Sequence, residues 1–122
     1  MAETEQEPAG LQETTATQVS RAMMRLYKEQ FGRGPERAWT YQCGEDVLVS
    51  LIVNSLTPVE RSLRDLGDAQ GVRDIRTRFQ HATEPHFRAA VEKATGRRVI
   101  GFMSGMDVEN DLASEVFTLE PR

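Results

Sequence analysis

Two histidines, one cysteine and a short acidic segment are the residues whose chemistry could support catalysis or metal binding in this chain. His81 and His86 lie five positions apart, which separates them by about 140° around a helix. They therefore do not form the i, i+4 pair that holds a divalent metal on one helix face. We interpret both as polar or boundary residues and predict no metal site there.

The acidic segment resembles the first half of a calcium-binding loop. Asp107, Glu109 and Asp111 alternate along the sequence as the ligands of such a loop do. The sixth position is Leu112, where the loop needs glycine, and the twelfth is Thr118, where it needs glutamate. Because the ligand set is incomplete, we interpret the segment as a solvated hairpin loop and predict neither a metal nor a cofactor.

Cys43 is the only cysteine, so no disulfide can form within one chain. A nucleophilic cysteine needs a base beside it, and the sequence places no histidine near this position. A cysteine in a strand is most often a small buried apolar residue, which is how we interpret it. The sequence thus contains no recognisable catalytic set and favours a protein that is not an enzyme.

The segment Gly32-Arg33-Gly34-Pro35 predicts the end of a helix followed by a turn. Gly32 can adopt the positive φ of a helix C′ position, and Pro35 prevents the helix from resuming. The segment follows a helix, so the helix dipole there repels anions and no phosphate loop is expected. A turn held by two glycines and a proline presents Arg33 outward, which makes it a candidate contact for a protein partner.

Three helices are predicted to position these side chains. Residues 71–96 keep helical spacing for longest, with Asp68 as a cap at the start and Gly96 at the end. The apolar residues expected to form its buried face are Val72, Ile75, Phe79, Ala82, Phe87, Ala90, Val91 and Ala94. A second amphipathic helix begins at about residue 15 or 17 and ends at Gly32.

The third helix is short and has a complete start signal. Thr57 is the predicted N-cap, Pro58 the first helical residue, and Glu60 the residue that completes a capping box. Its apolar residues are expected to face inward, and they are Val59, Leu63 and Leu66.

Four strands complete the predicted fold. Residues 38–43 and 47–53 read as one hairpin, and residues 99–104 and 115–119 as another, joined by the polar stretch 105–114. The order α-β-β-α-α-β-β predicts an α+β fold. We expect a two-layer sandwich in which two hairpins form an antiparallel four-stranded sheet with helices on one face.

Composition and charge limit the classes of function. Four of the 19 acidic residues lie within the first 14 positions, which are almost without apolar residues and are predicted to be a disordered acidic tail. Residues 15–122 are then a single domain with 15 acidic and 15 basic residues, and this balance argues against nucleic-acid binding. The longest apolar run, residues 47–53, is too short to span a membrane, and no secretory signal is present. We therefore expect a cytoplasmic protein.

Several motifs, in this order and at these separations, resemble the MpsC family, the soluble component of a Na⁺-translocating membrane potential-generating system. They are Gly32-Arg33-Gly34-Pro35, Val47-Leu48-Val49, Leu56-Thr57-Pro58 with Glu60, Val72 with Arg76, Thr95-Gly96-Arg97-Arg98-Val99, Phe102-Met103-Ser104, and Glu115-Val116-Phe117-Thr118-Leu119. The resemblance covers about residues 15 to 120. It implies a cytoplasmic accessory protein associated with a membrane cation or inorganic-carbon transport system, and it implies no reaction.

Two interpretations follow from the sequence. In the first, the protein is a non-catalytic accessory or regulatory module that binds membrane transporter subunits and associates with itself as a homo-oligomer. In the second, it is a small-ligand-binding or enzymatic α+β domain. The pocket would then lie between sheet and helices, with Arg33, Tyr41, Cys43 or His81 at its rim.

Overall fold

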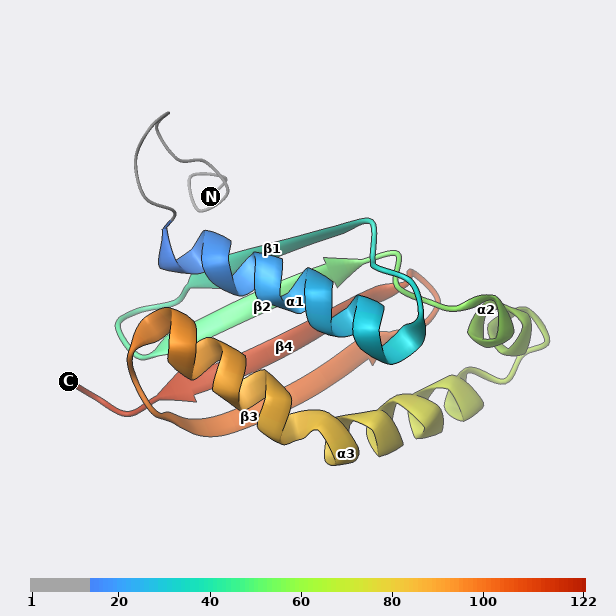
Figure 1. Cartoon of the computed structure of the whole chain (residues 1–122). Helices are drawn as coiled ribbons and strands as arrows, with labels where there is room; N and C mark the ends of the chain where they lie inside the picture. The colour runs from blue at the N-terminus through green and yellow to red at the C-terminus, as the bar shows by residue number, and fades with distance from the viewer. Residues whose placement is uncertain (1–13) are drawn as a thin grey trace.

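A computed structural model describes residues 14–122, which form three helices and one antiparallel sheet (Figure 1). The elements in chain order are α1 (Thr15–Phe31), β1 (Arg37–Gln42), β2 (Val47–Val53), α2 (Pro58–Asp65), α3 (Ala69–Thr95), β3 (Val99–Asp107) and β4 (Leu112–Leu119). Helices α1 and α3 lie across one face of the sheet, and α2 projects beyond its end. The predicted α+β fold and element order are confirmed.

The sheet consists of the two predicted hairpins, joined edge to edge in the order β1-β2-β4-β3. The hairpins meet where β2 pairs antiparallel with β4, so these two strands form the centre and β1 and β3 the edges. The second hairpin is longer than predicted, because the residues at 105–107 and 112–114 continue the strand ladder and only residues 108–111 turn. The prediction placed the ends of these two strands incorrectly because it relied on the polar composition of residues 105–114.

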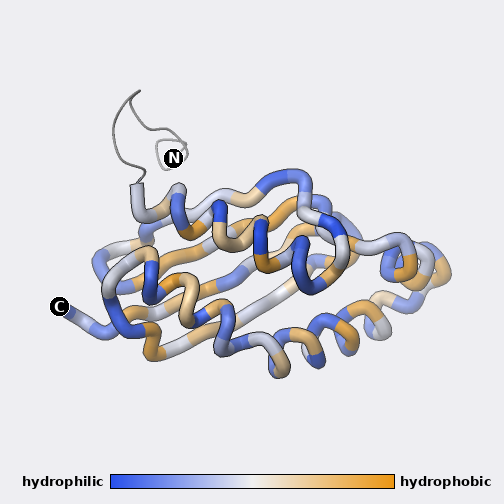
Figure 2. Tube along the Cα trace, viewed as in Figure 1, coloured by the Kyte–Doolittle hydropathy of each residue, from blue (hydrophilic) through white to orange (hydrophobic). Residues whose placement is uncertain are grey.

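The main core lies between the helices and the sheet. Its members from α1 are Val19, Ala22, Met23, Leu26 and Tyr27, those from α3 are Phe87 and Val91, and those from the strands and their ends include Leu48, Ile52, Val99, Ala113, Phe117 and Leu119. Figure 2 shows that apolar segments of both helices face strands that are themselves largely apolar. A smaller second cluster, Leu56, Val72 and Val108, fixes the start of α3 against the β3–β4 turn.

The predicted caps of the helices are present. Thr57 accepts a hydrogen bond from the Glu60 amide while the Glu60 side chain reaches back to the Thr57 amide, which completes the capping box of α2. Asp68 caps α3, and Gly96 ends it in the left-handed conformation. The predicted disordered tail lies outside the described residues except for Thr14, which is the N-cap of α1.

The predicted inward faces of α2 and α3 are wrong in part. On α2, Val59 and Leu66 are 67% and 83% exposed, whereas Glu60 is only 2% exposed. The helix takes this orientation because Glu60 pairs with a largely covered arginine of α3, described below. On α3, Ala82 is exposed, and Phe79 is partly exposed although its ring packs against the Phe31 ring.

Candidate functional site

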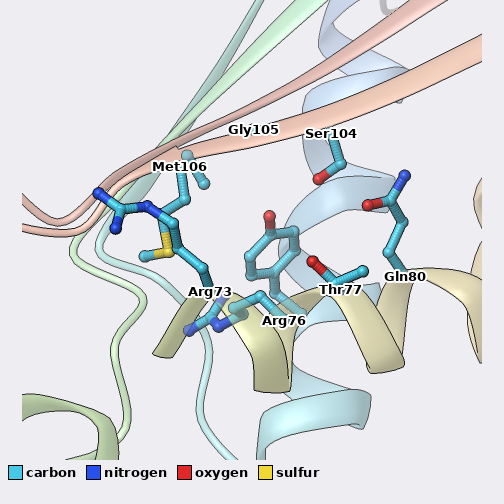
Figure 3. Close-up of a pocket in the computed structure, with 9 residues that line it drawn as sticks. Arg73, Arg76, Thr77, Gln80, Ser104, Gly105 and Met106 are labelled. Atoms are coloured by element: carbon cyan, nitrogen blue, oxygen red, sulfur yellow. The ribbon is translucent and has the colours of Figure 1, made fainter. Parts of the chain in front are cut away.

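A cavity of about 150 Å³ separates the first half of α3 from strand β3 (Figure 3). Its polar wall is formed by Tyr27 of α1, by Arg73, Arg76, Thr77 and Gln80 of α3, and by Ser104 of β3. A second, smaller hollow of about 30 Å³ shares Tyr27 and Arg76 with this cavity and is lined in addition by Gln30, Glu115 and aromatic rings of α1, α3 and β3. The cavity is therefore lined by the sheet and by both long helices.

Glu115 is the buried acidic group of the smaller hollow. It lies at an inward-facing position of β4, between Ala113 and Phe117, and is 3% exposed. The Tyr27 hydroxyl donates a hydrogen bond of 2.5 Å to Glu115 Oε2. Ser104, its cross-strand partner in β3, is the other neighbouring hydroxyl. The second carboxylate oxygen, Oε1, has no hydrogen-bond partner among the described residues.

Burial sets the charge of this carboxyl group. It raises the pKa of Glu115 from its ordinary value of 4.5 to about 7, although the hydrogen bonds of Tyr27 and Ser104 and the positive charge of Arg76 act in the opposite direction. The pKa of the Tyr27 hydroxyl is also raised, by burial and by the neighbouring Glu115 carboxylate. Glu115 thus exchanges a proton near neutral pH, while Tyr27 remains a hydrogen-bond donor.

Arg76 connects the cavity to α2. Its Nε and Nη2 atoms donate to the two Glu60 carboxylate oxygens at 2.7 and 2.8 Å, and Nη2 also donates to the Ser55 carbonyl at 3.0 Å. The guanidinium lies 4.0 Å from the centre of the Phe31 ring. Burial alone would raise the pKa of Glu60, but hydrogen bonds from Arg76 and Thr57 outweigh it and lower that pKa. The buried pair holds α2 in its unexpected orientation.

The structure does not bring the four pocket residues predicted from the sequence together. Tyr41 and Cys43 lie at one end of the sheet, and Cys43 is exposed after the end of β1 rather than buried in a strand. Arg33 lies at the opposite end, beside the residues that follow β2. His81 is exposed on α3. None of the four lines the cavity.

The turn after α1 ends that helix and also supports the segment that follows β2. Gly32 has φ of 79° and donates its amide hydrogen to the Lys28 carbonyl, while Gly34 and the buried Pro35 lead into β1. Arg33 is half-buried rather than directed fully outward, because its Nη1 donates to the carbonyls of Asn54 at 3.1 Å and Leu56 at 2.9 Å. Arg33 therefore braces the connection between β2 and α2.

The acidic segment also has a structural use. Asp111 accepts the amide hydrogens of Ser55 at 2.8 Å and Leu56 at 3.1 Å, and Asp107 accepts that of Asn110. Across residues 14–122 no group of three or more histidine, cysteine, aspartate or glutamate side chains is placed to hold a metal ion.

The face of the sheet opposite α1 and α3 is uncovered by any helix of the described chain. Alternation along the strands places nine apolar residues there, and we call them the open sheet face: Trp39, Tyr41, Val47, Val49, Leu51, Val53, Met103, Leu112 and Val116. All are at least partly exposed, with Met103 at 63%. A contiguous apolar surface of this kind typically marks an interaction site.

These features define a two-layer α+β protein with one covered and one open sheet face, and with a polar cavity under the covered side. Residues 12–121 match the sequence model of the family described as Na⁺-translocating membrane potential-generating system (MpsC), and the chain belongs to this family. Searches of curated proteins and of solved structures gave no match. Among residues 14–122, no helix has the length and apolar character needed to cross a membrane.

Proposed function

We propose that this protein is a non-catalytic, cytoplasmic accessory component of the Na⁺-translocating membrane potential-generating system. It acts through contacts with the membrane subunits of that system and as a homo-oligomer. Membership of the MpsC family supports the link to this membrane system. The observation that carries the protein-contact role is the outward apolar side of α2.

Val59 lies in α2 and Leu66 is the C-cap that follows the helix; they are seven positions apart, so both lie on the same side, and both are largely exposed. A surface helix normally buries its apolar residues, whereas α2 packs only Leu63 inward and buries Glu60 against Arg76. Two large apolar side chains on a projecting helix, next to charged residues such as Arg64 and Asp65, resemble the mixed surface of a protein interface more than a lipid-binding one.

Arg33 is the second proposed contact in this region. It donates to the Leu56 carbonyl, one residue before the cap of α2, so it lies at the base of the projecting helix. Because it also braces the loop, Arg33→Glu is expected to lower the free energy of unfolding by about 1 kcal/mol or more. Loss of partner capture by this variant is therefore evidence for a contact only if denaturation shows that the variant is still folded.

The test is affinity capture of the full chain from its own membranes, with bound subunits identified by mass spectrometry. The double variant Val59→Ser, Leu66→Ser is expected to lose the integral-membrane subunits while its urea midpoint stays near that of the natural chain, because both side chains are exposed. Ile100→Ser, at a 52% exposed apolar position of β3, is the matched control and should retain capture. Undiminished capture by the α2 variant would refute the proposed contact.

Small-ligand binding is a second candidate function, favoured by one observation. Glu115 Oε1 and Gln30 Nε2 are buried beside the cavity and have no partner among the described residues. A molecule that both donates and accepts hydrogen bonds would satisfy them. The hollow that Glu115 and Gln30 line holds about 30 Å³, enough for one polar group, and the neighbouring cavity of about 150 Å³ could hold the rest of a ligand of about the size of benzene.

A thermal-shift screen with metal ions, nucleotides and bicarbonate tests this function. A ligand at one hundred times its dissociation constant adds about 2.7 kcal/mol to the free energy of unfolding. A genuine cavity ligand should give a large upward shift for the natural chain and a smaller one for Glu115→Gln. Equal shifts in both proteins would place the binding elsewhere.

A further inference from the structure

The open sheet face has side chains that match a second copy of itself. Strand order and register place its residues in rows that cross β1, β2, β4 and β3. One row runs Arg37, Val53, Leu112, Asp107, the next runs Trp39, Leu51, Ser114, Gly105, and the next runs Tyr41, Val49, Val116, Met103. Each row thus begins on edge strand β1 and ends on edge strand β3.

We propose that a second copy of this chain covers the open sheet face, with a two-fold axis parallel to the strands and between β2 and β4. This deepens the homo-oligomer of the proposed function and rests on it. Such an axis places β1 of one copy over β3 of the other and keeps each row over the same row. Two sheets would then pack face to face about 10 Å apart, as in aligned β-sandwiches.

The ends of the rows are complementary in charge. Under this axis Arg37 of one copy lies opposite Asp107 of the second copy, and the arrangement occurs twice by symmetry. Arg37 already lies over the Trp39 ring, 4.1 Å from its centre, so the cation stands at the edge of the apolar patch. Opposite charges at the rim of an apolar centre favour one register of association over others.

The ends of the rows are also complementary in size. Trp39, the largest side chain of the face, lies opposite Gly105 of the second copy, and Tyr41 lies opposite Met103. The fold itself does not require glycine at 105: its φ is not positive, and an added β-carbon would meet only Ser114 Oγ at an ordinary 3.5 Å. A missing side chain at this position leaves room for an indole from another copy.

A two-fold axis perpendicular to the strands gives no such match. It would place β1 over β1 and reverse the order of the rows, so that Arg37 and Asp107 would no longer meet. The complementary ends therefore select the axis that runs along the strands, and cross-linking can distinguish the two arrangements.

The experiment combines sedimentation with thiol cross-linking in a full-length Cys43→Ser background. Chains carrying Tyr41→Cys are mixed with chains carrying Met103→Cys and treated with a bifunctional thiol reagent that spans about 10 Å, because facing sheets lie about 10 Å apart and a direct disulfide needs Cα atoms within about 7 Å. We expect the natural chain to sediment as a dimer and the mixture to give a cross-link that joins one chain of each kind.

Arg78→Cys, on the outer side of α3, replaces Met103→Cys in the control and should give no cross-link. Arg37→Asp should raise the dimer dissociation constant at least tenfold, and Asp107→Arg in the same chain should restore it. A monomeric natural chain, or a dimer that traps no Tyr41→Cys with Met103→Cys, would overturn this interface.

Different results would refute the dimer and the accessory role. A monomer that still captures membrane subunits through α2 would overturn the dimer and leave the accessory role standing. A trapped dimer that captures no membrane subunit would support the interface and refute the accessory role. If Val116→Glu abolished capture by a chain that is monomeric throughout, the occupant of the open sheet face would be a transporter subunit, and the second copy would be excluded.

Discussion

Replacing Glu115 by glutamine should remove most of the pH dependence of stability between pH 5 and pH 8. The natural carboxyl group has a pKa of about 7 in the folded protein and an ordinary value of 4.5 when solvated. Between these values the folded state binds more protons than the unfolded state, so stability falls as pH rises. Glutamine has a similar shape, accepts the Tyr27 hydrogen bond and does not ionise.

The size of the effect follows from the shift. A shift of 2.5 pKa units corresponds to about 3 kcal/mol at 1.36 kcal/mol per unit, of which about 2.5 kcal/mol is lost between pH 5 and pH 8. Tyr27 titrates above this window, because its pKa is raised from 10, and Glu60 titrates below it, because its pKa is lowered from 4.5. Among Glu115, Tyr27 and Glu60, only Glu115 should therefore make the free energy of unfolding depend strongly on pH between pH 5 and pH 8.

Urea denaturation at pH 5, 6, 7 and 8 measures the difference directly. The free energy of unfolding of Glu115→Gln minus that of the natural chain should grow by about 2.5 kcal/mol from pH 5 to pH 8, with the variant the more stable at pH 8. Glu109→Gln makes the same change at an exposed turn position and should give a flat difference. A flat difference for Glu115→Gln as well would show that the carboxyl group is not desolvated as the structure implies.

Four further substitutions, one of them a comparison, test by chemical denaturation the residues that support the fold. Thr57→Ala should lower the free energy of unfolding by about 1 kcal/mol through loss of the α2 cap, and Glu109→Ala by less than about 0.5 kcal/mol; the reverse ranking would contradict the capping role. Gly32→Ala should cost about 1 kcal/mol from its positive φ alone, since nothing lies within 4 Å of the added β-carbon, so no measurable cost would argue against a left-handed cap. Arg76→Ala should cost about 3 to 5 kcal/mol because Glu60 stays buried without its partner, and a loss below 1 kcal/mol would mean that α2 reorients freely.

The features of the fold that were predicted correctly are those set by local chemistry. Residues 47–53 form the predicted strand, Thr57 and Glu60 form the predicted capping box, and Gly96 ends the predicted long helix. Each depends on side chains within a few residues of one another, which a single sequence displays. The second hairpin was predicted too short because Gly105 and Ser114 pair across a ladder that only the neighbouring strand reveals.

The candidate site depended on contacts between distant residues and was not predicted. Tyr27 and Glu115 lie 88 positions apart, and the motif that begins at Glu115 indicates family resemblance without assigning that residue a role. One signal was available: in the segment 112–119, glutamate occupies a position that alternation assigns to the buried face, between alanine and phenylalanine. A charged residue in the inward register of a strand indicates a polar site under the helices.

The inverted orientation of α2 links the cavity to the surface proposed for partner binding. Arg76 lines the cavity, and its positive charge lowers the pKa of Glu115, while the same guanidinium holds Glu60 and so turns Val59 and Leu66 to solvent. An interaction between two charges is reciprocal, so the protonation state of Glu115 must also act on the Arg76–Glu60 pair. The pairing of Glu60 with Arg76 thus accounts for the outward position of Val59 and Leu66, while Leu63 still packs inward.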